Sequence, residues 1–529
     1  MTRPEHTGYD ADVAIVGYGP SGVIAATYLG MAGISTVVLE KDKDLYSRAR
    51  AVTVNDWTLR IFQEFGVAER VKQDMDPARG MTWKTYTGQT VFHLDVYPGE
   101  LGQPPAMMIY QPDMEQELRN NCAQHESLDL RFGHAFTKLS QDSEGVTLTA
   151  TDAADNPYDL RVKYVIGADG GSSRVREAAG YSLVGDTKPR RWLVIDGAVR
   201  KPWPGHDELV FWSDQTWPVV DIPLAKGNHR WEIPLNDGER DDDYESEERV
   251  WERLAPLGIT EENVTIKGWA FYSHHVRHLE KWRAGRVVMI GDAAHLMPPW
   301  AGQGMQSGIR DAQNIAWKIE ALVHGRVGED ILDTVQSERW MHVKEMTDIS
   351  LRLGRFIEME KGWAVGLRNW LAPKLQNVKL VIEALRPKNE TNRFVDGWAT
   401  GRTGRRSAVG RMIPQPQVTD ASGTTGLLDD LAGRGFLVFG LGTNPRHAMS
   451  PTQAQAWSAL GARFLTVHPA TDTATDPDSL VDHTGLLGDW AAKFDARVLV
   501  VRPDRLVAAT DATGLDVPAP PRQPQGEVT

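Results

Sequence analysis

Apolar runs that end in glycine-rich turns mark the first buried strands of the chain. Residues 12–19 (DVAIVGYG) lead into the turn GYGPSG, a small-residue helical pattern covers 21–33, and STVVLE follows at 35–40. Continuous apolar runs, in place of alternating ones, are typical of parallel strands that are covered on both faces. The first forty residues therefore predict a β-α-β unit.

Two later segments have the same strand-to-turn character. Strands over 147–170 end in VIGADGG, and VVMIGDAAHLMPPWAGQGM covers 287–305. Between them, residues 185–280 contain short strands broken by Pro, Gly and Asn, which is typical of an antiparallel sheet. Residues 306–385 have a mostly helical pattern. The chain is thus predicted to be an α/β protein with an antiparallel sheet inserted between two parts of a parallel one.

The C-terminal quarter of the chain is predicted to form a separate unit. Residues 386–417 are rich in Gly, Pro and Arg and read as a linker, part of which could pack on the body. Strand, helix and strand patterns over 418–515 predict a small α/β domain, and the Pro-rich residues 516–529 predict a disordered tail.

Composition narrows the function classes. A length of 529 residues predicts roughly three domains. The net charge of -13 argues against nucleic acid and anionic membranes as partners. With Cys122 as the single cysteine, the chain cannot form a disulfide framework or a thiolate metal site. The acidic run at 239–248 is interpreted as the start of a solvated helix, so no metal site is expected there or elsewhere. With no apolar run long enough to span a membrane, we expect a cytoplasmic protein.

The first turn carries a dinucleotide-binding pattern. Gly17, Gly19 and Gly22 follow the spacing G-x-G-x-x-G between a strand and a helix, and Glu40 ends the next strand. The glycines permit a tight turn, close approach of a pyrophosphate and close helix packing, while an acid about twenty residues on accepts the ribose hydroxyls. A nicotinamide cofactor and FAD would both suit this turn. A second such turn is absent, because GLGTNP at 440–445 lacks the third glycine.

The other two turns resemble the fingerprints of the flavoprotein aromatic hydroxylases, the class A single-component monooxygenases. The central motif is Asp169-Gly170-Gly171 followed by SSRVR, and the late motif runs from Gly291-Asp292 through Pro298-Pro299 to Gly302-Gln303-Gly304-Met305. RDAQNIAWK at 310–318 is similar to the helix that follows in the family, and the resemblance extends from about residue 10 to 385 and more weakly beyond. It implies a Rossmann-like FAD-binding domain (1–184 and 281–385, with a helical extension), a middle-sheet substrate domain (185–280) and a thioredoxin-like C-terminal domain (418–515).

The pattern and the resemblance together imply a set of FAD-binding residues. They are Gly17, Gly19, Pro20, Ser21, Gly22, Glu40, Lys41, Arg50, Gln111, Asp169, Gly291, Asp292, Pro299, Gly302, Gly304, Met305 and Gln306. The turn before 305 enters a helix, so its free N–H groups could stabilise negative charge on the flavin. Four alternatives stay open: Asp169 as a helix cap, Arg48 in place of Arg50, Gln111 as a helix-start residue, and His295 as a packed residue.

The family resemblance also implies the reaction. NAD(P)H reduces FAD, O2 adds to give a flavin C4a-hydroperoxide, and one oxygen passes to a phenol, so no residue is assigned as catalytic acid or base. Within the family the chain most resembles hydroxylases of 3-(3-hydroxyphenyl)propionate and 3-hydroxycinnamate, which implies ortho-hydroxylation in aromatic catabolism. A hydroxylase of another phenol or of a polyketide is the alternative, and NADH versus NADPH and a homodimer are left open.

Substrate contacts are expected on the middle sheet. An arylpropionate carboxylate calls for a cation or other hydrogen-bond donors, and a phenol ring calls for aromatic walls. The candidates are Arg230, Trp212, Trp217, Tyr272 and His274, with Arg190 and Arg191 as further cations.

Overall fold

A parallel sheet forms the centre of the first domain. The computed structural model describes residues 8–213, 218–357, 362–375 and 392–519. Strands β18 (Val287–Met289), β11 (Pro157–Gly167), β1 (Ala11–Val16), β2 (Thr36–Glu40) and β8 (Leu128–Phe132) lie side by side and parallel in that order. The predicted β-α-β unit is confirmed, with helix α1 (Pro20–Met31) between β1 and β2.

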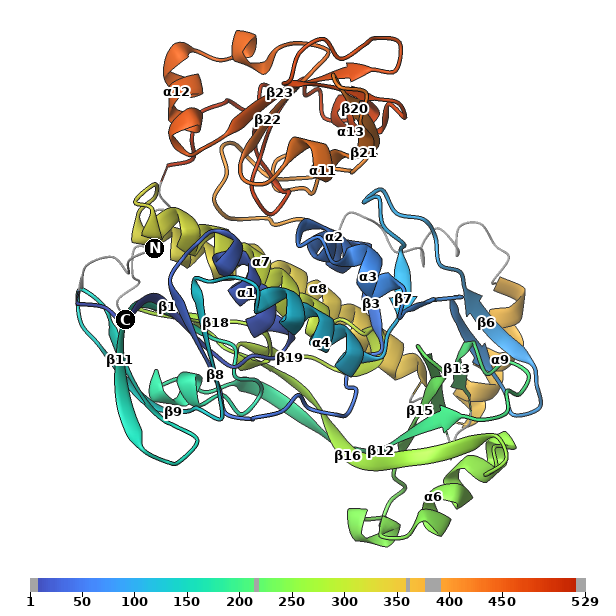
Figure 1. The fold of residues 1–529 in the computed structure, drawn as a ribbon. Coiled ribbons are helices and arrows are strands. Elements are labelled where there is room, and N and C mark those ends of the chain that lie inside the picture. The colour runs from blue at the N-terminus through green and yellow to red at the C-terminus, as the bar shows by residue number, and fades with distance from the viewer. Residues whose placement is uncertain (1–7, 214–217, 358–361, 376–391, 520–529) are drawn as a thin grey trace, which may run out of the picture.

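The edges of this sheet carry antiparallel strands. Short β17 (Arg283–Ala284) pairs with β18, and a ribbon of β9 (Ala135–Gln141) and β10 (Val146–Thr151) extends from β11. Helix α1 packs against α7 (Gly304–Val323) and α4 (Gln111–Cys122). The parallel strands therefore place the ends of β1, β2, β11 and β18 at one edge, from which the glycine-rich turns leave (Figure 1).

The middle sheet is larger than the sequence predicts. Its order is β19 (His295–Leu296), β16 (Val264–His278), β12 (Val184–Val199), β15 (Asn228–Pro234), β14 (Val219–Leu224), β13 (Leu209–Trp212), β5 (Met81–Lys84) and β6 (Thr90–Leu94). Residues 81–94 were assigned to the first domain by the predicted boundary at 184, yet β5 pairs in parallel with β13. This pairing joins residues more than a hundred positions apart, so no local pattern reports it.

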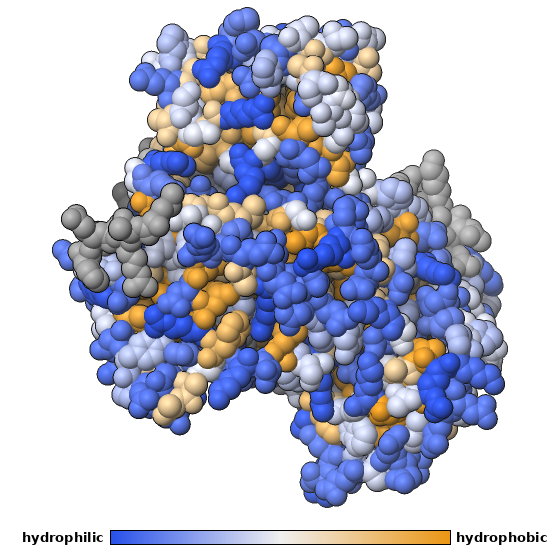
Figure 2. All heavy atoms as spheres, in the orientation of Figure 1, coloured by the Kyte–Doolittle hydropathy of each residue, from blue (hydrophilic) through white to orange (hydrophobic). Residues whose placement is uncertain are grey.

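One face of the middle sheet is covered by its own helix. Helix α6 (Glu247–Leu254), which follows a 3-10 turn at Asp241–Tyr244, packs with Trp231, Ile233 and Tyr244 in a separate apolar cluster. The other face packs toward the first domain, because its Trp192 and Val220 share a cluster with Trp300 of the late turn. The molecular surface is indented between the lobe that carries β9 and the lobe that carries α6 (Figure 2).

Smaller elements connect the two sheets. A three-stranded sheet is formed by β3 (Thr53–Asn55), β7 (Ala106–Met108) and β4 (Asp76–Pro77), beside helices α2 (Asp56–Glu64) and α3 (Ala68–Lys72). Helix α5 (Arg174–Ala178) follows the central motif. The predicted helical segment is observed as α7, α8 (Thr334–Ile357) and α9 (Gly362–Leu375). In the described part of the chain, no helix is long and apolar enough to cross a membrane.

The C-terminal domain lies over α2, α7 and α8 (Figure 1). Its strands are β20 (Gln417–Asp420), β21 (Thr425–Leu427), β22 (Leu437–Leu441), β23 (Arg463–Pro469), β24 (Ser479–Asp482), β25 (Val498–Val501) and β26 (Val507–Thr510), and its helices are α11 (Leu428–Ala432), α12 (Pro451–Ala459) and α13 (Leu486–Ala492). Strand β22 is parallel to β23 and antiparallel to β25, which pairs with β26. This β-α-β unit followed by a hairpin is the thioredoxin-like arrangement.

The segments around this domain are more ordered than predicted. In the described part of the predicted linker, Phe394, Trp398 and Ile413 are buried. The expected disordered tail begins with residues that pack, since Thr400 donates a hydrogen bond to the Asp516 carbonyl (2.8 Å), whereas residues 520–529 lie outside the described chain. Apolar and aromatic side chains inside these Pro/Gly-rich stretches explain the difference, because they bury against the body.

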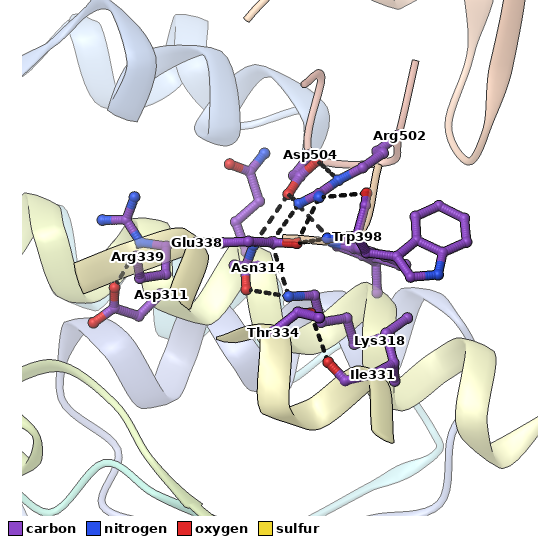
Figure 3. A network of polar contacts seen from close by, with 12 residues as sticks. Asp311, Asn314, Lys318, Ile331, Thr334, Glu338, Arg339, Trp398, Arg502 and Asp504 are labelled. Atoms are coloured by element: carbon purple, nitrogen blue, oxygen red, sulfur yellow. Dashed lines mark hydrogen bonds and ion pairs between the residues drawn. The ribbon is translucent and has the colours of Figure 1, made fainter. Parts of the chain in front are cut away.

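Buried ion pairs connect the C-terminal domain to helices α7 and α8 of the FAD-binding domain. Glu338 on α8 accepts hydrogen bonds from both terminal nitrogens of Arg502 (2.7 Å each) and from Lys318 of α7 (2.9 Å). Asp504 also binds Arg502. Figure 3 shows these side chains converging between α7, α8 and the C-terminal domain. Buried charges of both signs are thus paired within one network.

Candidate active site

In the first turn, Gly17 and Gly22 allow close approach of backbone segments. Gly17 has a positive φ of 95°, and a Cβ there would lie 2.5 Å from the Ala168 carbonyl oxygen. A Cβ on Gly22 would lie 2.0 Å from the Gly17 oxygen, so only glycine fits either position. A Cβ on Gly19 would meet nothing within 4 Å. The turn is therefore closed against the sheet at its first and third glycines and open at the second, where a pyrophosphate would approach.

Residues at the end of β2 face this turn. A Glu40 side-chain oxygen accepts a hydrogen bond from the Tyr18 backbone N–H (2.7 Å), and the other accepts one from Asp42 N–H (3.0 Å). Lys41 is exposed beside it, and Pro20 and Ser21 begin α1. The predicted acid thus lies at the expected end of β2, next to the glycine turn.

Asp169 of the central motif acts as a helix cap in this structure. Its carboxylate accepts hydrogen bonds from the Ser173 hydroxyl (2.5 Å) and from the N–H groups of Arg174 (2.8 Å) and Val175 (3.1 Å) at the start of α5. Burial raises the pKa of this carboxyl. The capping alternative is therefore realised, and it holds the motif against Gly17 without excluding a further role toward a cofactor.

The late motif brings Gly291 and Asp292 to the same edge. The Ser21 hydroxyl fits between two glycines, because a Cβ on Gly291 or Gly308 would lie 2.5 or 2.2 Å from its oxygen. Asp292 is exposed, yet burial raises the pKa of its carboxyl while His295 and Arg50 lower it. The Asp292 carboxylate is therefore accessible although protein atoms lie around it.

His295 is a packed residue of this loop. Its Nε2 lies 2.6 Å from a carboxylate oxygen of Asp311, which also accepts from the Gly291 N–H (3.1 Å). Arg339 donates to the other oxygen of Asp311 (2.8 Å). The structural alternative for His295 is therefore the observed one, and Asp311 positions the loop that carries Asp292.

The turn before α7 presents backbone N–H groups. Gly302 has a positive φ of 60°, and Gly304 and Met305 begin the helix with partly accessible surfaces. Pro299 is exposed beside them. Gln306 points inward instead, accepting from Asn55 N–H (2.9 Å) and donating to the Gly302 carbonyl (2.8 Å). Gln306 thus supports the turn, whose free N–H groups remain available to a cofactor.

The segment around residue 50 is held by Gln111 and by the middle sheet. The Gln111 side-chain oxygen accepts from the N–H groups of Arg50 and Ala51, both at 2.7 Å, so Gln111 shapes this loop. Arg48 donates to the Trp269 carbonyl of the middle sheet (3.0 Å). Arg50 is exposed, with its guanidinium 4.8 Å from the Tyr46 ring centre. Of the two candidate arginines, Arg48 and Arg50, it is Arg50 that leaves an accessible cation near Asp292.

The middle sheet supplies an aromatic wall next to the late turn. The His274 ring stacks on Trp192 (5.1 Å between centres), and both lie against Trp300, at 4.8 and 4.7 Å. Burial, with a smaller contribution from His275, lowers the pKa of His274 to about 4, so its imidazole is neutral near pH 7. Tyr272 lies on the same side, and burial raises its pKa.

Trp212, a predicted substrate residue, faces the side of the middle sheet that α6 covers. Trp212 donates a hydrogen bond to an Asp221 carboxylate oxygen (3.0 Å) and packs in the α6-side cluster, on the side of the sheet away from Trp300. Side chains alternate along a strand, and one position decides the face. Trp217 lies outside the described residues.

Arg230 is on the cofactor side of the sheet but its donors are engaged. It makes two hydrogen bonds to Asp196 (2.8 and 3.0 Å) and further ones to the carbonyls of Ala49 and Arg50. Arg230 therefore fastens the loop before residue 51 to the middle sheet. Arg191 faces the α6 side, in an ion pair with Asp241 (2.7 Å), and Arg190 donates to the Leu235 carbonyl (3.3 Å).

Glu232 is a site residue that sequence reasoning missed. It lies two residues after Arg230 on β15, on the same side of the sheet. The available signal was the two-residue period of HRWEIP, which sets Arg230 and Glu232 opposite the buried Trp231. Charged side chains on both alternate positions of a buried strand indicate a polar interior surface.

These residues fit FAD. An open glycine turn at the end of β1, an acid at the end of β2, an accessible carboxylate at Asp292 and free helix N–H groups at Gly304 lie along one edge of a parallel sheet. That edge is where dinucleotides bind in this architecture. With an aromatic-walled sheet facing the same turn, the fold and site define a flavoprotein hydroxylase.

Comparisons with known proteins identify the family. Residues 10–350 match the family described as FAD binding domain, and residues 410–517 match that described as HcaD C-terminal domain. The 3-(3-hydroxy-phenyl)propionate/3-hydroxycinnamic acid hydroxylases of Escherichia coli K12 and Shigella sonnei are each 33% identical over 513 residues, covering 95% of this chain and 92% of theirs. The chain belongs to this FAD-binding family and is a flavoprotein aromatic hydroxylase, with FAD as cofactor and NAD(P)H and O2 as co-substrates.

Known structures share the whole fold. The flavin-dependent monooxygenase PieE, in complex with FAD and substrate, matches with a TM-score of 0.79 and 22% identity over 94% of this chain and 95% of its own. Aklavinone-11 hydroxylase, in a ternary complex with FAD and aklavinone, gives 0.76 and 22% over 98% and 97%. The C-terminal domain is therefore part of the shared architecture.

Proposed function

We propose that this enzyme hydroxylates a phenolic aromatic acid ortho to its hydroxyl, with 3-(3-hydroxyphenyl)propionate and 3-hydroxycinnamate as substrates and their 2,3-dihydroxy derivatives as products. The observation that carries the proposal is the 33% identity to hydroxylases named for these substrates, which extends through both the FAD-binding and the C-terminal regions. The proposed setting is the catabolism of aromatic compounds inside the cell.

Residues of the three turns hold FAD in this proposal. The open side of Gly19 and the accessible Arg50 bind the pyrophosphate, Glu40 binds the adenosine ribose, and Asp292 accepts hydrogen bonds from the ribityl hydroxyls. The N–H groups at the start of α7 would hold the pyrimidine edge of the flavin, where helix-terminal dipoles would stabilise negative charge. Bound FAD supplies the redox chemistry, accepting hydride from NAD(P)H and activating O2.

The protein contributes to the reaction by positioning the substrate and excluding water from the site. Trp192, Trp300 and His274 form a buried aromatic wall beside Pro299, where a phenol ring would stack. Exclusion of water by such a wall protects a reactive oxygen species from wasteful decay. Because Arg230 is paired with Asp196 and Arg50 is assigned to the pyrophosphate, the carboxylate of the substrate is expected to meet backbone donors.

A panel of phenols tests this function. The purified FAD-loaded enzyme is mixed with NADH or NADPH and each phenol, and both nucleotide oxidation and hydroxylated product are measured. We expect 3-(3-hydroxyphenyl)propionate to give the highest coupled kcat/KM, with 3-hydroxycinnamate close to it. Strong coupled turnover of simple phenol or of a polyketide phenol, with none of the arylpropionate, would contradict the proposed substrate and favour the alternative hydroxylase.

A further inference from the structure

The cofactor-facing side of the middle sheet has one acid at its centre. Glu232 on β15 lies between Val194 of β12 and Val220 of β14, its register partners, and both valines are buried. On β12, Trp192 is two residues before Val194 and contacts Trp300 of the late turn. The same side of the sheet is therefore joined to the cofactor loops at this end.

The opposite end of this surface is also fastened to a cofactor loop. Arg230, two residues before Glu232, donates to the carbonyls of Ala49 and Arg50. Glu232 thus lies on a short stretch of strand between two attachments to the FAD-binding domain. A ring stacked beside Trp192 and Trp300 would have Glu232 on the adjoining part of the sheet surface.

Glu232 differs from three buried acids, Glu338, Asp311 and Asp429, in having no hydrogen-bond or ion-pair partner among the described residues. Glu338, Asp311 and Asp429 are each held by arginine side chains. Glu232 makes no hydrogen bond or ion pair with any residue that the structure describes, although it is only partly accessible. An acid without a protein partner on the wall of an active site indicates a ligand that pairs with it.

The surroundings of Glu232 select the kind of ligand. Burial has the largest effect on the pKa of Glu232 and raises it. The neighbouring Arg230 lowers this pKa, and Asp196 raises it. Since Arg230 is already paired with Asp196, its guanidinium is not free to bind a substrate carboxylate beside Glu232. A phenolic hydroxyl, which is a neutral hydrogen-bond donor, is the complementary group.

We propose that Glu232 is a catalytic residue that accepts the hydrogen bond, and then the proton, of the substrate's phenolic hydroxyl. The phenolic O–H bond breaks, a carboxyl O–H bond forms on Glu232, and the electron pair stays on the phenolate oxygen. That charge increases electron density at the ortho carbon, which makes the ring a better nucleophile toward oxygen. The proton returns to the same oxygen before the product leaves. This inference rests on the proposed function.

The matched pair E232Q and D186N tests it. Gln keeps the size and an acceptor oxygen but cannot take the proton, and Asp186 is an exposed acid on β12 of the same sheet. We expect E232Q to keep FAD and to bind 3-(3-hydroxyphenyl)propionate within a few-fold of wild type, whereas kcat falls by roughly 100-fold or more, the range for a lost general base. D186N should behave as wild type.

Substrate acidity separates proton transfer from a merely structural role. A ring-fluorinated substrate, which ionises at lower pH, should recover most of the lost turnover in E232Q. Equal losses for both substrates, or unchanged turnover in E232Q, would overturn the assignment. If wild type oxidises another phenol instead, the proposed substrate fails, and the same comparison with that phenol and its fluorinated form still tests Glu232.

A binding measurement covers the case in which E232Q does not fold. The ultraviolet absorption of a phenol changes on ionisation, so substrate bound to wild-type holoenzyme can be titrated without turnover. We expect phenolate to form at a lower pH in the complex than in water. Ionisation of bound and free phenol at the same pH would refute a proton-accepting role for Glu232.

Discussion

Replacing Glu338 by Gln is expected to loosen the joint between α8 and the C-terminal domain. The Glu338 carboxylate, which is 1% exposed, binds both terminal nitrogens of Arg502 and the ammonium of Lys318 (Figure 3). The Arg502 and Lys318 charges lower the pKa of Glu338 from 4.5 to about 2 despite the opposing effect of burial. The variant therefore leaves two buried cations with Asp504 as the remaining acid.

The magnitude follows from that pKa. A change from 4.5 to about 2 corresponds to about 3 kcal/mol, which agrees with the ~3–5 kcal/mol cost of breaking a buried ion pair. Burial already lowers the pKa of Lys318 to about 8. Without Glu338 it falls further, and loss of the lysine proton near neutral pH limits the cost. We expect the free energy of separating the domains to drop by about 2–4 kcal/mol.

The sign of the pH dependence is also determined. Because the pKa of Glu338 is lower in the folded protein, its contribution is complete above pH 4.5 and disappears as the pH falls toward 2. The difference between wild type and E338Q should shrink as the pH falls below 4.5.

Urea unfolding followed by tryptophan fluorescence measures the effect, since Trp317 and Trp398 lie at this joint. Limited proteolysis gives an independent readout of domain separation. E345Q is the control, because Glu345 is on the same helix and makes no ion pair within the described residues. Equal urea midpoints for E338Q and E345Q would refute the claim that the network holds the domains together.

Two further predictions concern FAD. G19V should fold with a normal urea midpoint but purify with little flavin, because its side chain fills the open side of the turn. G17V should fail to fold, since even a Cβ there meets the Ala168 carbonyl at 2.5 Å. A yellow G19V protein would contradict the pyrophosphate assignment. D292A should lose charged hydrogen bonds worth ~1.5–3 kcal/mol each and bind FAD at least tenfold more weakly, as measured by flavin fluorescence on titration, and full flavin occupancy after dialysis would contradict the role of Asp292.

Local patterns in the sequence were sufficient to locate the glycine turn and the acid that we propose bind FAD. Glycine spacing, a strand before each turn and an acid at the end of β2 are short-range features with direct physical reasons, so the sequence alone places Gly17 and Gly19 in the turn and Glu40 at the strand end. The same holds for the order of domains, since the apolar period changes from continuous to broken near residue 185 and again near 306.

The partners of each side chain were decided by tertiary structure. Nothing near Arg230 in the sequence reports that Asp196, 34 positions away, takes its charge, or that this pairing leaves Glu232 alone. Strands β5 and β6 joined the middle sheet through a pairing across more than a hundred residues, and Trp212 turned to the α6 side because a shift of one residue reverses the face of a strand. Sequence patterns therefore determined which residues end each strand, whereas long-range packing determined which side of the sheet each side chain faces and which charged groups are paired.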